Sequence, residues 1–212
     1  MGRRLRYQVA ASLDGFIAGP EGEYDWIVND PGVDFDALFK EFDTLVMGRK
    51  TYEMMTAQGG DGGVNGKDVV VFSRTLPAKS TPGLRIVNDE PAGIIKALKA
   101  KKGRDIWLFG GGELFRSLLD LGVVDTVEVA VMPVLIGSGI PLVPAGSLAK
   151  LKYSGHKVLP DSGIVVVSYR VAGSRAAAQP IRYIRDTPAR ATARRGTKTP
   201  PKKKATPKRR RR

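Results

Sequence analysis

The chain has 212 residues, of which 42% are hydrophobic, enough for one domain with a substantial core. It contains no cysteine and one histidine, His156, which excludes disulfides, thiol nucleophiles, cysteine-ligated metals and sites built on a histidine pair, so we expect no metal site. The net charge of +14 is uneven, because residues 174–212 hold 15 Lys or Arg and one acidic residue, and residues 1–173 are neutral overall. The high charge therefore belongs to the C-terminal segment.

That segment is rich in Ala, Pro, Thr, Lys and Arg and poor in large apolar residues, a composition typical of disorder. We therefore expect two regions, a folded domain over residues 1–173 and a disordered polybasic tail over 174–212. A polybasic tail neutralises phosphates through a salt-sensitive, sequence-independent attraction, so we expect nonspecific nucleic acid as its partner. A merely solubilising extension is the alternative.

The longest uncharged run covers residues 129–149 and has the length of a membrane span. Prolines and glycines interrupt it at Pro133, Gly137, Gly139, Pro141, Pro144 and Gly146. Near the N-terminus, Arg6, Gln8 and Asp14 interrupt what would be the core of a signal peptide. We expect a soluble, cytoplasmic protein that has no membrane partner.

Strands and helices alternate in the first part of the chain. Residues 5–11 predict a strand that runs into a turn at Asp14 and Gly15. Residues 34–42 place apolar side chains at helical spacing behind Asp34, a residue type that caps helices. A short apolar run at 44–47 then leads through the sequence GRKT into a helical pattern, and the Gly-rich stretch 57–67 predicts a mobile loop.

The second part of the chain continues this alternation and then changes. We expect strands at 68–73, 84–87 and 105–109, and helices at 91–101 and 113–121. Long β runs follow at 126–136, 153–159 and 164–171, and the last two need no helix between them. The predicted class is α/β, a three-layer α/β/α fold with a mostly parallel sheet and an antiparallel C-terminal hairpin.

Three of the predicted strands end in groups that suit phosphate. They run into Gly110-Gly111-Gly112, into Gly48-Arg49-Lys50-Thr51 and into Ser73-Arg74. Helix N-termini carry partial positive charge, and Arg matches phosphate geometry. A tight turn explains an isolated glycine triplet, and solvent exposure explains an isolated arginine. Parallel strands end at one edge of a sheet, so these three strand ends should lie close together. Their occurrence in one chain predicts one phosphate-rich ligand at that edge.

Five segments in chain order carry a family resemblance. They are SLDGFIA at 12–18, MGRKTYE at 47–53, VVFSR at 70–74, GGGEL at 110–114 and MPVLIGSGIPL at 132–142. Together they resemble the dihydrofolate reductase superfamily, and they are most similar to its RibD C-terminal-domain branch, the riboflavin-biosynthesis reductases and their stand-alone relatives. The resemblance covers most of residues 4–171.

The resemblance implies a dihydrofolate-reductase-like fold, often paired as a homodimer, and an NADPH-dependent oxidoreductase. It implies reduction of a C=N or C=O bond of a pteridine-like or ribosylamino-pyrimidine-like heterocycle, as a dihydrofolate or 5-amino-6-(5-phosphoribosylamino)uracil reductase does. The implied cofactor-binding residues are Ala11, Gly48, Arg49, Thr51, Ser73, Arg74, Gly110, Gly111, Gly112, Glu113 and Leu114. The implied substrate-binding residues are Gly15, Gly137 and Gly139, and the implied catalytic residues are Asp14 and Asp36. Trp26, in a loop near the expected site, is a further substrate-binding candidate, because its aromatic ring can face a substrate.

The chain departs from the folate enzymes at the first helix. Those enzymes carry a Pro-Trp segment followed by an acid that binds the pterin, whereas here Trp26 leads into an Asp30-Pro31-Gly32 turn. Asp34 or Asp36 can take the place of that acid, although Asp34 equally suits a helix cap. The departure argues against folate as the substrate. The alternative function is a nucleic-acid-associated protein whose tail binds DNA or RNA and whose fold is catalytically idle.

Overall fold

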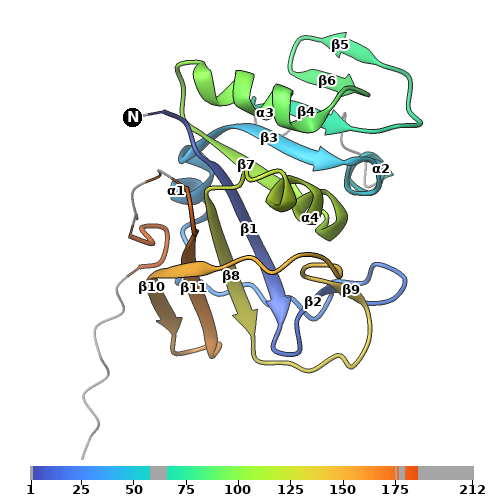
Figure 1. Ribbon diagram of the computed structural model, residues 1–212. Coiled ribbons are helices and arrows are strands. Elements are labelled where there is room, and N and C mark those ends of the chain that lie inside the picture. The colour runs from blue at the N-terminus through green and yellow to red at the C-terminus, as the bar shows by residue number, and fades with distance from the viewer. Residues whose placement is uncertain (1, 58–65, 175, 177–179, 186–212) are drawn as a thin grey trace, which may run out of the picture.

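The computed structural model describes residues 2–57, 66–174, 176 and 180–185 (Figure 1). Most of the loop expected at 57–67 and most of the expected tail lie outside these residues. No helix in the described part of the chain is long and apolar enough to cross a membrane.

A nine-stranded sheet forms the centre of the described structure, in the order β10-β11-β8-β1-β7-β3-β4-β6-β5. In chain order its strands are β1 (Leu5–Ser12), β3 (Phe42–Gly48), β4 (Asp68–Phe72), β5 (Lys79–Thr81), β6 (Leu84–Val87), β7 (Asp105–Gly110), β8 (Thr126–Met132), β10 (Leu151–Leu159) and β11 (Ile164–Val171). Neighbours from β8 to β6 are parallel, whereas β10 and β11 form an antiparallel hairpin beside β8. The predicted fold class is confirmed.

Helices cover both faces of this sheet. The helices are α1 (Phe35–Lys40), α2 (Arg49–Ala57), α3 (Pro91–Ala100) and α4 (Gly112–Asp120). Figure 1 views the sheet with α3 and α4 in front, and their side chains pack with those of β1 and β7 in one core. Side chains of α1 and α2 pack in a second core on the opposite face. The arrangement has three layers.

Continuous apolar runs explain the central strands, because each of their faces is covered. Val69, Val70 and Val71 of β4 are almost completely buried and alternate between the two cores. Tyr7 of β1 stacks on Phe115 of α4 with ring centroids 3.8 Å apart. Trp107 of β7 is 7% exposed and belongs to the core.

The element boundaries differ from the sequence prediction in a few places. Strand β8 ends at Met132, four residues early, because Pro133 has no N–H to donate to a neighbouring strand. The short strand β5 is exposed along its length, so no apolar pattern marks it. A separate pair, β2 (Phe16–Ala18) with β9 (Ile140–Pro141), joins the turn after β1 to the loop after β8. These strands are too short for an alternation of apolar and polar residues to mark them in the sequence.

The segment 180–185, which we name the C-terminal strap, packs on the face that carries α1. Ile181, Tyr183 and Ile184 are 4–7% exposed. The strap's backbone pairs with residues 32–34, since the Asp34 N–H donates to the Tyr183 carbonyl (2.7 Å) and the Arg185 N–H to the Gly32 carbonyl (2.9 Å). The folded part of the chain therefore extends beyond the expected boundary at residue 173.

Beneath the strap lies a buried ionic cluster on β1 and β8. Arg6, 3% exposed, donates to both carboxylate oxygens of Glu128 at 2.9 and 3.0 Å and also pairs with Glu41. Burial lowers the pKa of Arg6, but the two carboxylates outweigh it and the net pKa is raised. Burial also raises the pKa of the Tyr183 phenol, which covers this cluster and stays neutral.

Candidate active site

The strand ends that the sequence singled out lie side by side at the carboxyl edge of the sheet. Strand β3 lies between β7 and β4, and all three are parallel. Gly48 at the end of β3 pairs with Phe72 of β4, and Met47 pairs with Gly110 at the end of β7. Three segments far apart in the chain thus converge at this edge.

Two helices begin at this edge, α2 and α4, and of their first turns only that of α4 holds an acidic residue, Glu113. Helix α4 has Gly111 at its N-cap, with no side-chain hydrogen bond, and α2 has no acidic residue in its first turn. By contrast, Asp34 caps α1 by accepting from the Ala37 N–H (2.9 Å), and Glu90 caps α3. The partial positive charge at the N-terminus of α2 is therefore available to an anion, whereas Glu113 offsets part of the charge at the N-terminus of α4.

The glycines at the start of α4 allow close packing around it. A Cβ on Gly110 would lie 3.1 Å from the Thr51 hydroxyl of α2, and a Cβ on Gly112 would lie 2.7 Å from the Pro141 carbonyl oxygen. The peptide bond between Gly110 and Gly111 is cis. Helix α2 and the segment from Pro141 to Pro144 thus both approach the N-terminus of α4, which leaves no room for a side chain at Gly112 and little at Gly110.

Two arginines flank the neighbouring turn after β4. Arg49, at the start of α2, donates from Nη1 to the Thr75 hydroxyl (3.0 Å). Arg74 is exposed and forms no ion pair or hydrogen bond with any described residue. The Ser73 hydroxyl, which we expect to face a phosphate, accepts from the N–H groups of Thr75 (3.2 Å) and Leu76 (2.9 Å). Ser73 shapes the turn that carries Arg74.

Asp14 ties the turn after β1 to the loop after β8. Its carboxylate accepts from the N–H groups of Ile136 (3.1 Å) and Gly137 (2.7 Å). Hydrogen bonding from the Ser12 side chain and from these N–H groups lowers the pKa of this exposed carboxyl. Asp14 is therefore charged at neutral pH, a state that suits positioning of the loop better than donation of a proton.

The expected substrate-side glycines gather around this link. The Gly15 carbonyl accepts from the Leu142 N–H at 2.8 Å. Gly137 and Gly139 have φ angles of +77° and +155°, and a Cβ on Gly139 would lie 2.1 Å from the Ala18 carbonyl oxygen. Only glycine fits at Gly139.

The other residues predicted for the site, Ala11, Trp26, Asp36, Glu113 and Leu114, differ in their surroundings. Ala11 is 1% exposed and belongs to the core, so its side chain is not available to a ligand. Trp26 packs against the second core, and its indole N–H donates to the Glu23 carbonyl. Asp36 is exposed in the first turn of α1 and forms no hydrogen bond or ion pair with a described residue. Among the remaining cofactor candidates, Glu113 is exposed and Leu114 packs beside Gly48.

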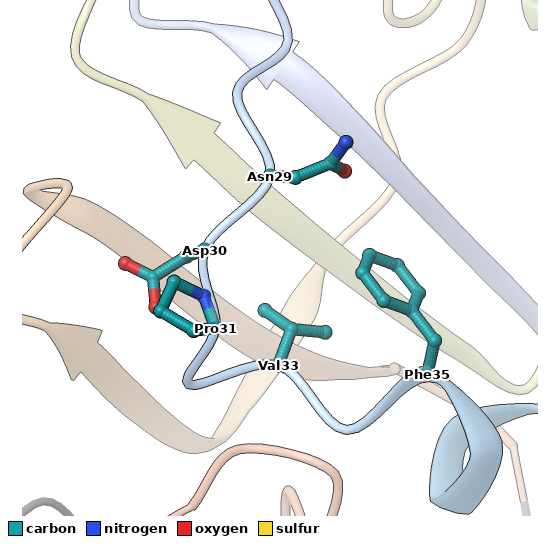
Figure 2. A pocket seen from close by; sticks show the side chains of 5 residues that line it. All are labelled: Asn29, Asp30, Pro31, Val33 and Phe35. Carbon is teal, nitrogen blue, oxygen red and sulfur yellow. The ribbon is translucent and has the colours of Figure 1, made fainter.

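An open cavity of about 700 Å³ lies in front of α1 and is lined by Asn29, Asp30, Pro31, Val33 and Phe35. Figure 2 shows the side chains of Asn29 and Phe35 on one side of the loop and that of Asp30 on the other. Phe35 is 46% exposed, so its ring offers a flat apolar surface to the cavity that Asn29 also lines. The strap pairs with this same loop from behind.

Sequence reasoning missed several residues at this edge. Thr75 receives the Arg49 hydrogen bond, and Asn88 bonds to the turn after β4 from the end of the neighbouring strand. Asn88 directly follows β6, a position equivalent to that of Ser73 after β4, and this signal could have found it. No three His, Asp or Glu side chains in the described part of the chain are grouped to hold a metal ion.

Comparison with known proteins gives the family. A sequence profile of the RibD C-terminal domain matches residues 3–167. The chain belongs to this family. It is also 32% identical over 183 residues to YyaP of Bacillus subtilis strain 168, which is described as uncharacterized, and the match covers 81% of this chain and 96% of YyaP.

Solved structures agree with this family membership. A candidate riboflavin biosynthesis protein from Shewanella sp. PV-4 is 30% identical, with a TM-score of 0.67 over 81% of this chain and 99% of that chain. A diaminohydroxyphosphoribosylaminopyrimidine deaminase/5-amino-6-(5-phosphoribosylamino)uracil reductase from Thermotoga maritima is 16% identical, with a TM-score of 0.60 over 81% and 57% of the two chains. A dihydrofolate reductase from Enterococcus faecalis complexed with NADP(H) is 18% identical, with a TM-score of 0.57 over 80% and 96%. The last two likenesses show the fold alone. The domain has a reductase fold.

Proposed function

We propose that this protein is an NADPH-dependent reductase of a nitrogen heterocycle. The observation that carries the proposal is a pair of helix N-termini at neighbouring strand ends beside Arg49 and Arg74: α2, whose first turn holds no acidic residue, and α4, whose N-cap Gly111 makes no side-chain hydrogen bond. The oxygens of one pyrophosphate can accept hydrogen bonds from backbone N–H groups of both helices. The two guanidinium groups suit a further phosphate. A nucleotide with a pyrophosphate and a 2′-phosphate offers anionic groups for both sets of positive charge.

The glycine-lined start of α4 supports the fit of such a nucleotide. Because Gly110 and Gly111 carry no side chains, a phosphate can approach the backbone directly. When bound, NADPH supplies the hydride, and the protein's task is to orient the cofactor and to shape the substrate's surroundings. Asp14 serves that task by holding the loop at Gly137 beside the turn after β1.

We propose the cavity in front of α1 as the substrate site. The exposed ring of Phe35 suits stacking against a flat heterocycle, and the Asn29 amide offers both a donor and an acceptor to ring nitrogens and carbonyls. A pteridine-like or ribosylamino-pyrimidine-like ring has these features. The similarity to the Shewanella protein, which is named for riboflavin biosynthesis, supports this substrate class.

The test is a thermal-shift titration of the full chain with NADPH and NADH in parallel, because a ligand of the native state raises the melting temperature. We expect a larger shift with NADPH. Arg49→Ala and Arg74→Ala should each weaken NADPH binding and leave NADH binding nearly unchanged. Arg85→Ala removes an equally exposed guanidinium from β6 and serves as the control. An unchanged preference in both site variants would show that the cofactor assignment is wrong.

We also propose that the polybasic segment contacts nucleic acid independently of the reductase domain, on the basis of its 15 Lys or Arg and one acidic residue. Deletion of residues 186–212 should abolish salt-sensitive duplex binding, and binding that survives the deletion would contradict the proposal.

A cytoplasmic homodimer is our further proposal. The edge strand β10, with exposed Leu151, Tyr153 and Val158, supports the pairing of two copies. Light scattering that gives a monomer mass at micromolar concentration would contradict it.

A further inference from the structure

The turn after β4, residues 73–76, is held in one shape by its own first residue. The Ser73 hydroxyl accepts from the N–H groups of Thr75 and Leu76, which satisfies two backbone donors inside the turn. The Ser73 N–H donates to the Val87 carbonyl of β6 at 3.0 Å, so the turn begins in register with the neighbouring strand. The carbonyl groups of the turn need a donor from elsewhere.

Asn88 supplies that donor from the end of β6. Its side-chain amide donates to the Ser73 carbonyl at 2.7 Å and to the Leu76 carbonyl at 3.0 Å. A primary amide has two N–H groups, and one nitrogen here bridges the first and last residues of the turn. Asn88 therefore fixes both ends of the turn to β6.

This fixed turn carries the groups that the proposed 2′-phosphate site uses. Arg74 lies between the two clamped residues and has no partner among the described residues, so its direction depends on the turn's backbone. Thr75 receives the Arg49 guanidinium at 3.0 Å, so the turn also anchors the second cation. Arg74 therefore depends on a backbone shape that Asn88 maintains, and Arg49 depends on it in part, because Arg49 also pairs with Glu53 of its own helix at 3.8 Å.

We propose that Asn88 is a positioning residue that determines the preference of this site for a 2′-phosphorylated nucleotide. The inference rests on the proposed function. Asn88 acts through the turn, by holding Arg74 and Thr75 where a 2′-phosphate lies, and it does not touch the pyrophosphate region at α4. Its loss should therefore affect ligands that carry the 2′-phosphate and spare those that lack it.

The experiment compares four ligands by calorimetry on the full chain: NADPH, NADH, adenosine 2′,5′-bisphosphate and AMP. Loss of two hydrogen bonds in Asn88→Ala should weaken binding of NADPH and of the bisphosphate by about tenfold. Binding of NADH and AMP should not change. Asn88→Asp removes the donors, adds a negative charge and should weaken binding of the two 2′-phosphate ligands further.

A double-mutant cycle separates positioning from a general loss of stability. If Asn88 acts through Arg74, the effect of Asn88→Ala on NADPH binding should be much smaller in an Arg74→Ala background. Equal weakening of NADPH and NADH, or full additivity with Arg74→Ala, would overturn the inference. A wild-type chain that binds NADPH and NADH equally would also overturn the inference about Asn88, but it would still agree with a reductase that uses a nicotinamide cofactor. A wild-type chain that binds neither nucleotide would overturn the proposed function as well.

Discussion

The C-terminal strap should be part of the domain's stable core, and Ile184→Ala tests this directly. Ile184 is 5% exposed, bridges to Val33 and packs in the second core. Truncation of a buried isoleucine to alanine costs about 2–5 kcal/mol, and we expect about 3 kcal/mol here because the strap lies at the margin of the core. For a domain of this size, that loss lowers the melting temperature by about 6–12 °C.

Two truncations extend the same test. A chain that ends at residue 185 keeps the strap and should melt like the full chain. A chain that ends at residue 173 lacks it, exposes apolar side chains of the second core that pack with Ile181, Tyr183 and Ile184, and should melt at a clearly lower temperature. Thermal unfolding followed by circular dichroism at neutral pH measures all of these variants.

The control for the point variant is Leu148→Ala, because Leu148 is 88% exposed and its truncation should leave the melting temperature unchanged. Equal melting temperatures for the chains that end at 173 and 185, together with a silent Ile184→Ala, would refute the reasoning. That result would mean that the strap's side chains contribute no more than solvated residues do.

Three further predictions concern single sites. Arg6→Met leaves Glu128 buried without its partner and should lower the free energy of unfolding, measured in denaturant, by about 3–5 kcal/mol. The double variant Arg6→Met/Glu128→Leu removes the unpaired charge and should recover much of this loss. No recovery in the double variant would contradict the prediction. Because the pKa of Asp14 is lowered in the folded state, its charged form stabilises the protein above the ordinary pKa of 3.8 and loses this effect as the pH falls through the lowered value. Asp14→Asn should therefore melt below wild type at pH 7, and the gap should close in acid; a gap that persists at low pH would count against the link to Gly137. Gly112→Ala places a Cβ 2.7 Å from the Pro141 carbonyl and should lower both stability and NADPH affinity, whereas a Cβ at Gly155 meets nothing within 4 Å, so Gly155→Ala should be silent.

Much of the candidate site follows from local sequence signals. The apolar runs of β3, β4 and β7 predict buried parallel strands, and parallel strands must end at one edge. Groups that directly follow those strands, such as Arg49, Arg74 and Gly111, were therefore predicted to converge, and they do. Asp34 was predicted as a helix cap, and it accepts the Ala37 N–H.

Other features depend on contacts between distant residues, which no local pattern encodes. Ile181, Tyr183 and Ile184 lie in a segment whose composition is typical of disorder, and they become buried only because the strap pairs with residues 32–34. Asn88 is 15 residues from Ser73 in the chain, and only the adjacency of β4 and β6 brings its amide to that turn.

By itself, the sequence determined the alternation of strands and helices, the edge at which the proposed phosphate-binding groups gather and the separation of charge along the chain. Periodicity and composition act over a few residues, so they determine local elements and the ends of those elements. The tertiary structure alone decided which hydroxyls and carboxylates remain free for a ligand. Ser73 and Asp14 became parts of the scaffold, because the strands and loops that pack beside them present backbone N–H groups that their oxygens satisfy.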